Sequence, residues 1–295
     1  DMIGKRIPHN KKERDEKYID ELENKDYTRL QDKMIVAIDP NKGDLIYCVN
    51  GTDKERVQFR YTQDQRRKET KQKKYRNIIL KLKEEKIENE SVIERETKLS
   101  TYNGRTLDID KFKEYLAIKN EVNKKLYSFY EQNIFRKLRL HGYINRLRSE
   151  QMMISNFIDK FDKPEKVVVC FGDWEQKKQM KYKEPTKGKG IRKIFRNNGF
   201  EEYLVDEHRT SCKCSKCFGE CEKFRECENP RPWKKGTMIT RHGLLRCKTC
   251  KVLWNRDENS SVNIYKIAKC AIDKKERTKY LCRQEKNQST LVVVT

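Results

Sequence analysis

Two pairs of cysteines are the residues whose types and spacing most clearly indicate chemistry. Cys214 and Cys217 form one Cys-x-x-Cys pair, and Cys247 and Cys250 form another. Two intervening residues let both thiolates of a pair face the same ion, and four thiolates complete the tetrahedron that zinc prefers. The pattern therefore predicts a structural zinc site.

The choice of ligands is not unique, because further candidates lie nearby. The two pairs are separated by 29 residues, a long spacer that contains Cys221, Cys227 and His242, and Cys212 precedes the first pair. Unrelated free thiols would hardly form two matched pairs, and a disulfide cluster is disfavoured because we see no signal peptide. Zinc held by the two pairs is the favoured interpretation.

Acidic residues indicate a second kind of metal site. Hydrolysis of a phosphodiester by two divalent ions needs carboxylates from several elements of the fold. Asp39 ends an apolar run, and Asp257 begins the last predicted helix. Between them lie three candidates for a third carboxylate, namely Asp173, Glu175 and Glu207.

Each acid also has an ordinary structural interpretation. Asp39 precedes a proline, and Asp-Pro after a strand is often only a turn. Asp257 can complement the dipole of its helix, a role that is compatible with metal binding. Glu207 could be an exposed charge at the end of a strand. The combination of the three signals favours a metal site.

The elements that must position these residues point to an α/β fold. Apolar and β-branched runs predict strands at 34–39, 45–49, 56–61, 166–172 and 200–206. The fourth run is almost continuously apolar, which indicates a sheet covered on both faces. Cys48 and Cys170 lie inside strands and are expected to be core thiols. Three consecutive strands with an aspartate on the first are how a ribonuclease-H-like fold begins.

The region between the third and fourth strands is expected to be helical. Apolar residues at helical steps between Asp108 and Phe161 predict two long helices, with a break near His141-Gly142. Residues 84–107 are polar and are expected to form a loop. The basic stretch 65–83 is equally compatible with contact to a nucleic-acid backbone and with a solvated helix face.

The composition indicates a polyanionic partner. The chain has 295 residues, a net charge of +23 and 39% charged residues, so nucleic acid is the default partner. A membrane surface is disfavoured because there is no transmembrane run or strong amphipathic anchor. Eleven cysteines fit a reducing compartment, and a chain that begins at Asp1 fits a fragment or a processed product.

The order of motifs resembles a known family. The sequence reads Thr-Ser-x-x-Cys-x-x-Cys at 210–217, then a second Cys-x-x-Cys, then Arg-Asp-x-Asn-x-x-x-Asn-Ile at 256–264. This order resembles the C-terminal end of TnpB-type transposon nucleases. Asp206-Glu207 before the first knuckle is similar to the Fanzor proteins, their eukaryotic and viral relatives. The likeness covers about residues 34 to 270.

The resemblance implies a RuvC nuclease domain of the ribonuclease-H-like fold that cuts target DNA under the direction of a guide RNA. It implies catalytic magnesium held by Asp39, Glu207 and Asp257, with structural zinc in the ribbon. The middle glutamate of relatives usually ends the fourth strand, where this chain has Phe171-Gly172, so Glu207 is expected to replace it. Asn41 stands where relatives usually have glycine.

The resemblance also implies a domain organisation. We expect a lead-in at 1–33, the nuclease domain at 34–209 with a helical insertion at about 62–161, a zinc ribbon at 210–254, and a final helix and tail at 255–295. Relatives carry recognition domains before the first strand, where this chain has 33 residues. An intracellular protein is expected, nuclear in a eukaryotic host or encoded by a virus that infects one.

A noncatalytic zinc module that binds nucleic acid, left from a transposon-encoded protein, is the alternative function. Such a module would keep the basic surface and the thiolates without any need for its acids to converge. The relative positions of Asp39, Glu207 and Asp257 discriminate between the two.

Overall fold

The computed structural model describes residues 16–52, 56–87, 90–174 and 187–283. The chain divides into two compact units. The sheet unit comprises residues 1–63 and 153–295, and the helical unit comprises residues 64–152.

A five-stranded mixed sheet forms the centre of the sheet unit, which confirms the α/β expectation. Its order is β3-β2-β1-β6-β7. The first three strands along the chain pair antiparallel, whereas β6 is parallel to β1, and β7 is parallel to β6. All five predicted strands are present, with ends within one residue of the prediction: β1 Met34–Asp39, β2 Asp44–Asn50, β3 Val57–Thr62, β6 Val167–Gly172 and β7 Glu201–Val205.

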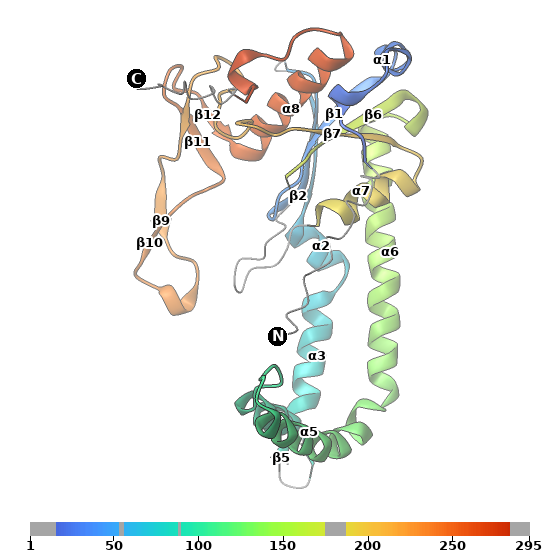
Figure 1. Ribbon diagram of the computed structural model, residues 1–295, viewed down its shortest axis with the longest axis vertical. Coiled ribbons are helices and arrows are strands. Elements are labelled where there is room, and N and C mark those ends of the chain that lie inside the picture. Colours follow the sequence, from blue (N-terminus) through green and yellow to red (C-terminus); the bar gives the residue numbers. More distant parts are fainter. Residues whose placement is uncertain (1–15, 53–55, 88–89, 175–186, 284–295) are drawn as a thin grey trace, which may run out of the picture. The chain divides into compact units, whose positions relative to one another are not determined.

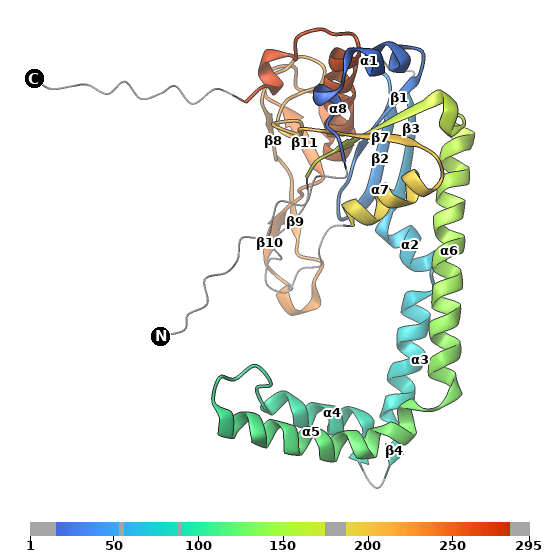
Figure 2. The same ribbon diagram turned by 45° about the vertical axis from the view of Figure 1, so that its right-hand side comes forward.

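Helices cover both faces of this sheet (Figure 1). Successive side chains of a strand point to opposite faces, so Val36 and Ile38 share one face while Ile35 and Ala37 share the other. The first face packs against α7 (Gly188–Asn197) and the last residues of α6 (Asn133–Phe161), and the second packs against α8 (Arg256–Ile272). Figure 2 shows α8 beside the strands. Asp39 has the same parity as Ile35 and Ala37 and therefore belongs to the α8 face.

The core contains the expected thiols and part of the N-terminal lead-in. Cys48 and Cys170 are fully buried, and burial raises the pKa of Cys170 to about 12, so both are core thiols as predicted. The described part of the lead-in contains η1 (Ile19–Glu21) and α1 (Asn24–Gln31). Their residues Ile19 and Leu30 are buried in the core on the α8 face.

The cysteine-rich segment follows β7 and consists of short strands. The strands β8, β11 and β12 form a three-stranded sheet, and β9 pairs with β10 in a separate hairpin. This hairpin (Figure 1) accounts for the long spacer between the two cysteine pairs. The elements are β8 Cys221–Glu222, β9 Glu226–Glu228, η4 Pro232–Lys234, β10 Met238–Thr240, β11 Leu244–Cys247 and β12 Leu253–Asn255.

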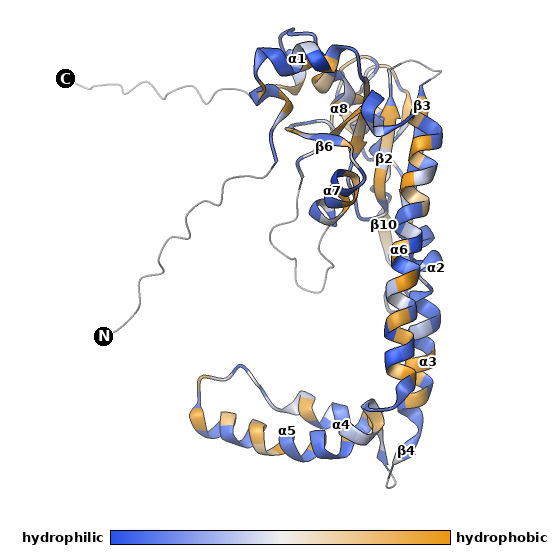
Figure 3. Cartoon of the chain, turned by 90° about the vertical axis from the view of Figure 1, so that its right-hand side faces the viewer, coloured by the Kyte–Doolittle hydropathy of each residue, from blue (hydrophilic) through white to orange (hydrophobic). Residues whose placement is uncertain are grey.

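The helical unit has a small core of its own, made by Val92, Val122, Leu126 and Phe129. Figure 3 shows hydrophobic residues alternating with hydrophilic ones along α5, as expected for an amphipathic helix. Its elements are α2 Gln63–Glu69, α3 Gln72–Glu84, β4 Lys86–Ile87, β5 Glu90–Ser91, α4 Val92–Lys98, η2 Leu99–Thr101, α5 Ile109–Tyr130 and the first part of α6. Among the described residues, no helix is long and apolar enough to cross a membrane.

Two expectations for the helical region are wrong. The predicted loop at 84–107 contains α4, which begins with a capping box between Ser91 and Glu94. The break between the long helices lies at residues 131–132 rather than at His141-Gly142. Glycine costs a helix only about 1 kcal/mol relative to alanine, which the surrounding helix formers outweigh.

Candidate metal sites

Three acidic side chains gather at the ends of parallel strands. Asp39 is the last residue of β1, Asp173 follows β6, and Glu207 lies two residues beyond β7. Because these strands are parallel neighbours, their carboxyl ends meet at one edge of the sheet. Asp39, Asp173 and Glu207 line a cavity of about 280 Å³ at this edge, together with Asn41 and Arg256.

Glu207 occupies the space that a side chain at position 172 would need. A Cβ atom built on Gly172 would lie 2.7 Å from Cγ of Glu207 and closer still to its carboxylate. Real Cβ atoms essentially never approach so closely. The space beside Gly172 at the end of β6 is therefore filled by a carboxylate from the segment that follows the neighbouring strand β7.

The carboxylate of Glu207 is buried and incompletely satisfied. Its atom Oε1 has no hydrogen-bond partner in the described part of the chain, although the backbone N–H of Trp174 donates to the carboxylate. Burial, and then the charge of Asp173, raises the pKa of Glu207 to about 8. An orphaned, buried carboxylate oxygen is the kind of atom that a divalent cation would satisfy.

Asp39 is in a similar environment. Its side chain is buried, and burial raises its pKa well above the ordinary range. The negative charges of Glu207 and then of Asp257 raise the pKa of Asp39 further, so both carboxylates act on Asp39. A cation among them would replace this repulsion with attraction.

Asp257 lies in the first turn of α8, where the side chain of Asn255 caps the helix by accepting a hydrogen bond from the backbone of Asp257 (2.9 Å). Oδ1 of Asp257 accepts a hydrogen bond from Nδ2 of Asn41 (2.6 Å). Asn41 thus connects Asp257 to the loop after β1. Burial raises the pKa of Asp257.

The acids approach one another without closing into one tight cluster. Asp257 does not line the cavity, although its partner Asn41 does. Among the residues that the structure describes, no three acidic side chains have oxygens all within 4.8 Å of one another. Arg256 also lines the cavity, and its positive charge lowers the pKa of Asp39 and of Glu207. Glu175 lies outside the described residues.

The four predicted cysteines meet at one point. The sulfur atoms of Cys214, Cys217, Cys247 and Cys250 all lie within 4.8 Å of one another. Burial would raise the pKa of Cys247, but hydrogen bonds, first from the backbone of Cys250 and then from the side chain of Cys217, lower it to about 6. A thiolate is the form that binds zinc, so this group of four can bind a zinc ion.

Both cysteine pairs have the same local geometry. The residue after each pair adopts positive φ, 67° at Phe218 and 59° at Lys251. Its backbone N–H donates to the carbonyl of the first cysteine of the pair, over 2.9 Å at Cys214 and 3.1 Å at Cys247. Two equivalent turns thus present their thiolates to a common centre.

The remaining zinc candidates are separate from this centre or secondary to it. Cys212 is exposed, and Cys227 and His242 lie in or beside the β9–β10 hairpin. Cys221 is the nearest of them, since the charges of all four clustered thiolates, after burial, raise its pKa to about 12.

Buried polar residues of α8 tie the two sites together, a role that sequence reasoning missed. Nδ2 of Asn259 and of Asn263 each donate to the carbonyl oxygens of Thr210 and Lys213. Thr210 in turn donates through its hydroxyl to the carbonyl of Glu207 (3.0 Å). The asparagine spacing of i and i+4 within the motif was the available signal, because it places both amides on one side of a helix.

Comparison with known proteins gives weak structural similarity only. No family model matches the chain, and no curated protein matches it. A solved structure of the mini-RNA-guided endonuclease CRISPR-Cas phi3 is similar with a TM-score of 0.47 and 11% sequence identity. The similarity covers 85% of this chain and 46% of that one, so this chain spans less than half of that protein's length. The function proposed below therefore depends on the geometry of the site itself.

Proposed function

We propose that this chain is the RuvC-like region of a metal-dependent, RNA-guided DNA endonuclease of the TnpB and Fanzor kind. The observation that carries the proposal is the buried carboxylate of Glu207 in the side-chain space of Gly172, in the same cavity as Asp39. The strand order, with three antiparallel strands followed by two parallel ones, supports a ribonuclease-H-like fold.

Asp39, Glu207 and Asp257 would hold magnesium. When bound, two such ions supply an activated water and stabilise the leaving oxygen of the phosphodiester. Asn41 would keep the carboxylate of Asp257 oriented through its hydrogen bond. Arg256 lines the same cavity and would bind the phosphate through a guanidinium that is always charged.

The four clustered cysteines would hold a structural zinc that supports this site. The segment that leads into the turn of Cys214 and Cys217 is bonded through its carbonyl groups at 210 and 213 to two asparagines of α8, the helix that also bears Asp257. Zinc in this turn would therefore fix the distance between Glu207 and α8. Structural zinc contributes its binding free energy directly to folding.

A noncatalytic nucleic-acid-binding zinc module is the second candidate. It is favoured by the fact that no three described acidic side chains meet within 4.8 Å. Against it, a binding module gains nothing from buried carboxylates with raised pKa values, because such groups lower stability unless a cation binds them.

A DNA-cleavage assay of the Glu207→Gln variant tests the proposal. In the full-length protein purified with its bound RNA, with magnesium present, we expect this variant to lose DNA cleavage while nucleic-acid binding persists. Asp173→Asn and Glu175→Gln are the matched controls and should keep most activity. Normal cleavage by Glu207→Gln, together with loss in either control, would refute the assignment.

A further inference from the structure

A cavity of about 700 Å³ lies between α3 and α6 within the helical unit. We call it the helical groove and define it by Tyr75, Arg76, Leu80, Arg139, Tyr143 and Arg146. It is built entirely from residues 64–152 and is thus distinct from the acidic cavity of the sheet unit.

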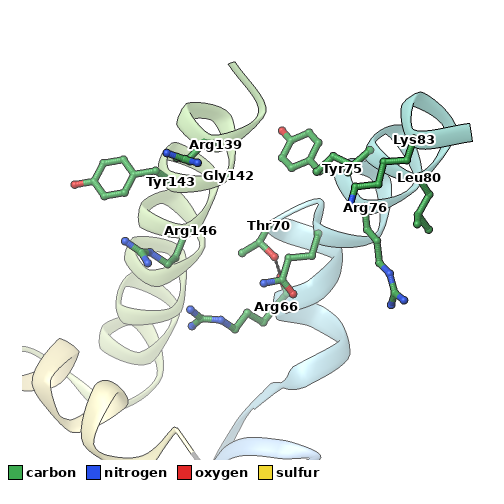
Figure 4. Close-up of a pocket in the computed structure, with 12 residues that line it drawn as sticks. Arg66, Thr70, Tyr75, Arg76, Leu80, Lys83, Arg139, Gly142, Tyr143 and Arg146 are labelled. Atoms are coloured by element: carbon green, nitrogen blue, oxygen red, sulfur yellow. Dashed lines mark hydrogen bonds between the residues drawn. The ribbon is translucent and has the colours of Figure 1, made fainter. Parts of the chain in front are cut away.

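Helical spacing places the lining residues of each helix on one face of that helix. Arg139, Tyr143 and Arg146 follow one another at steps of four and three residues, so they share one face of α6. Figure 4 shows these three side chains projecting from the same side of that helix. On α3, Arg76 and Leu80 are four residues apart and likewise share a face.

The groove is held open by hydrogen bonds between the helices. Nδ2 of Asn145 donates to the hydroxyl of Tyr75 (2.8 Å), and the hydroxyl of Ser149 donates to Oε2 of Glu69 (2.6 Å). Asn145 and Ser149 are both buried, so these bonds are protected from water. A preformed groove binds without the entropy loss of ordering its walls.

Three of the cations that line the groove lack counter-charges, whereas Lys83 pairs with Glu96 at 2.8 Å. In the described parts of the chain, Arg76, Arg139 and Arg146 have no acidic partner within ion-pair distance, and all three are exposed. The segment that forms α3 contains five basic residues and one acidic residue. The nearby acid Glu150 is already paired with Arg66 at 3.1 Å. Uncompensated cations on facing helices repel one another, which a polyanion would relieve.

An exposed aromatic ring adds a second recognition element. Tyr143 is 51% exposed, and the guanidinium of Arg146 lies 5.3 Å from the centre of its ring. Leu80 contributes apolar surface to the same groove and is 40% exposed. Arginine pairs with phosphate through two hydrogen bonds, and an open aromatic face stacks on an unpaired base.

We propose that the helical groove binds a single-stranded segment of nucleic acid, with phosphates on Arg139 and Arg146 and a base stacked on Tyr143. An acidic peptide or an anionic membrane would use the arginines but would gain nothing specific from the exposed ring. The inference extends the proposed function with a second contact to nucleic acid, and it does not depend on catalysis.

Fluorescence anisotropy of a labelled 20-nucleotide single strand, measured without added divalent ions, tests the groove. We expect Arg139→Gln/Arg146→Gln to lower affinity at least tenfold and to reduce the salt slope by about 1.4, because each phosphate contact contributes about 0.7. Tyr143→Leu should lower affinity about tenfold by loss of stacking, whereas Tyr143→Phe should keep it. RNA and DNA strands are measured separately, and a loss of affinity for either strand supports the proposed binding in the groove.

The matched control removes the same charge elsewhere in the helical unit. Lys111→Gln/Lys124→Gln changes two exposed lysines of α5 and should lower affinity by less than twofold. Equal losses in control and groove variants would overturn the proposal, as would wild-type affinity in Tyr143→Leu. Groove variants that lose binding to phosphatidylserine vesicles or to polyglutamate, but not to oligonucleotides, would also overturn it. Circular dichroism verifies that each variant folds. If the groove does not bind nucleic acid, the cleavage test of Glu207 still stands, because that test does not depend on the groove.

Discussion

Under the proposed function, Gly172→Ala should abolish DNA cleavage by displacing Glu207, a residue 35 positions away in the sequence. The new Cβ would lie 2.7 Å from Cγ of Glu207 and even closer to its carboxylate, so Glu207 must move. Overpacking of this kind costs about 1–3 kcal/mol of unfolding free energy, which an otherwise stable fold tolerates. Loss of a metal-bridging carboxylate should cost about 4 kcal/mol of transition-state stabilisation, or about 10³-fold in rate.

The assay is magnesium-dependent DNA cleavage by the full-length protein purified with the guide RNA of the proposed function, alongside thermal denaturation. Gly43→Ala is the matched control, because a Cβ at Gly43 would meet nothing within 4 Å, and it should cut like the wild type. A Gly172→Ala variant that folds and cuts at the wild-type rate would refute the reasoning.

A reciprocal exchange separates displacement of Glu207 from general damage. Glu207→Gly alone removes the carboxylate, whereas Gly172→Glu combined with Glu207→Gly returns one to the same space from the neighbouring strand β6. We expect the double variant to recover at least tenfold over Glu207→Gly. A double variant with no recovery would show that the carboxylate must come from the segment after β7. That result would contradict the idea that a carboxylate at position 172 can fill the same space.

Four further outcomes are expected. Metal analysis should find about one zinc ion per chain. Cys214→Ser or Cys247→Ser should lose the zinc and lower the free energy of unfolding by several kcal/mol, whereas variants that keep both metal and melting temperature would contradict the zinc site. Asn263→Ala should lower cleavage more than nucleic-acid binding, because it frees the Thr210 turn; equal losses in both assays would indicate a general structural defect. Burial would raise the pKa of Glu201, but hydrogen bonds from Arg29, Tyr203 and Lys33 outweigh burial and lower the pKa from 4.5 to about 2. The resulting stabilisation is present above pH 4.5 and is lost as the pH falls toward 2. Glu201→Gln should therefore flatten the fall of unfolding free energy between pH 4.5 and 2, and an unchanged pH profile would refute this prediction. Binding to nucleic acid should weaken steeply with salt, and a salt-independent affinity would indicate another kind of partner.

The sequence was sufficient for the parts of the fold that depend on local patterns. Apolar and β-branched runs located all five strands of the sheet within one residue at each end. The signal is continuous for β1, β2 and β6 because these strands are buried on both faces. The spacing of Cys214 and Cys217, repeated at Cys247 and Cys250, identified the four thiolates that come together.

The features that depend on tertiary contacts were not predictable in this way. The helix break at residues 131–132 brings the ring of Phe129 against that of Phe135, a contact between two helices, whereas the sequence offered the more conspicuous glycine at position 142. The helix α4 is short and polar, so its capping box was a weaker signal than the surrounding charge. The spacing of Asn259 and Asn263 places both amides on one side of a helix, but their partner Thr210 lies about 50 residues away, so the local pattern could not identify it.

A crystal structure of the protein soaked with manganese, a substitute for magnesium with a measurable anomalous signal, tests the central claim most directly. We predict an anomalous peak in the cavity at the end of β1 and β7, within about 2.3 Å of carboxylate oxygens of Asp39 and Glu207, with Asp257 moved toward it. A cavity without a peak at saturating manganese, or an ion held by Asp206 and Asp173 while Glu207 remains unbound, would contradict the account.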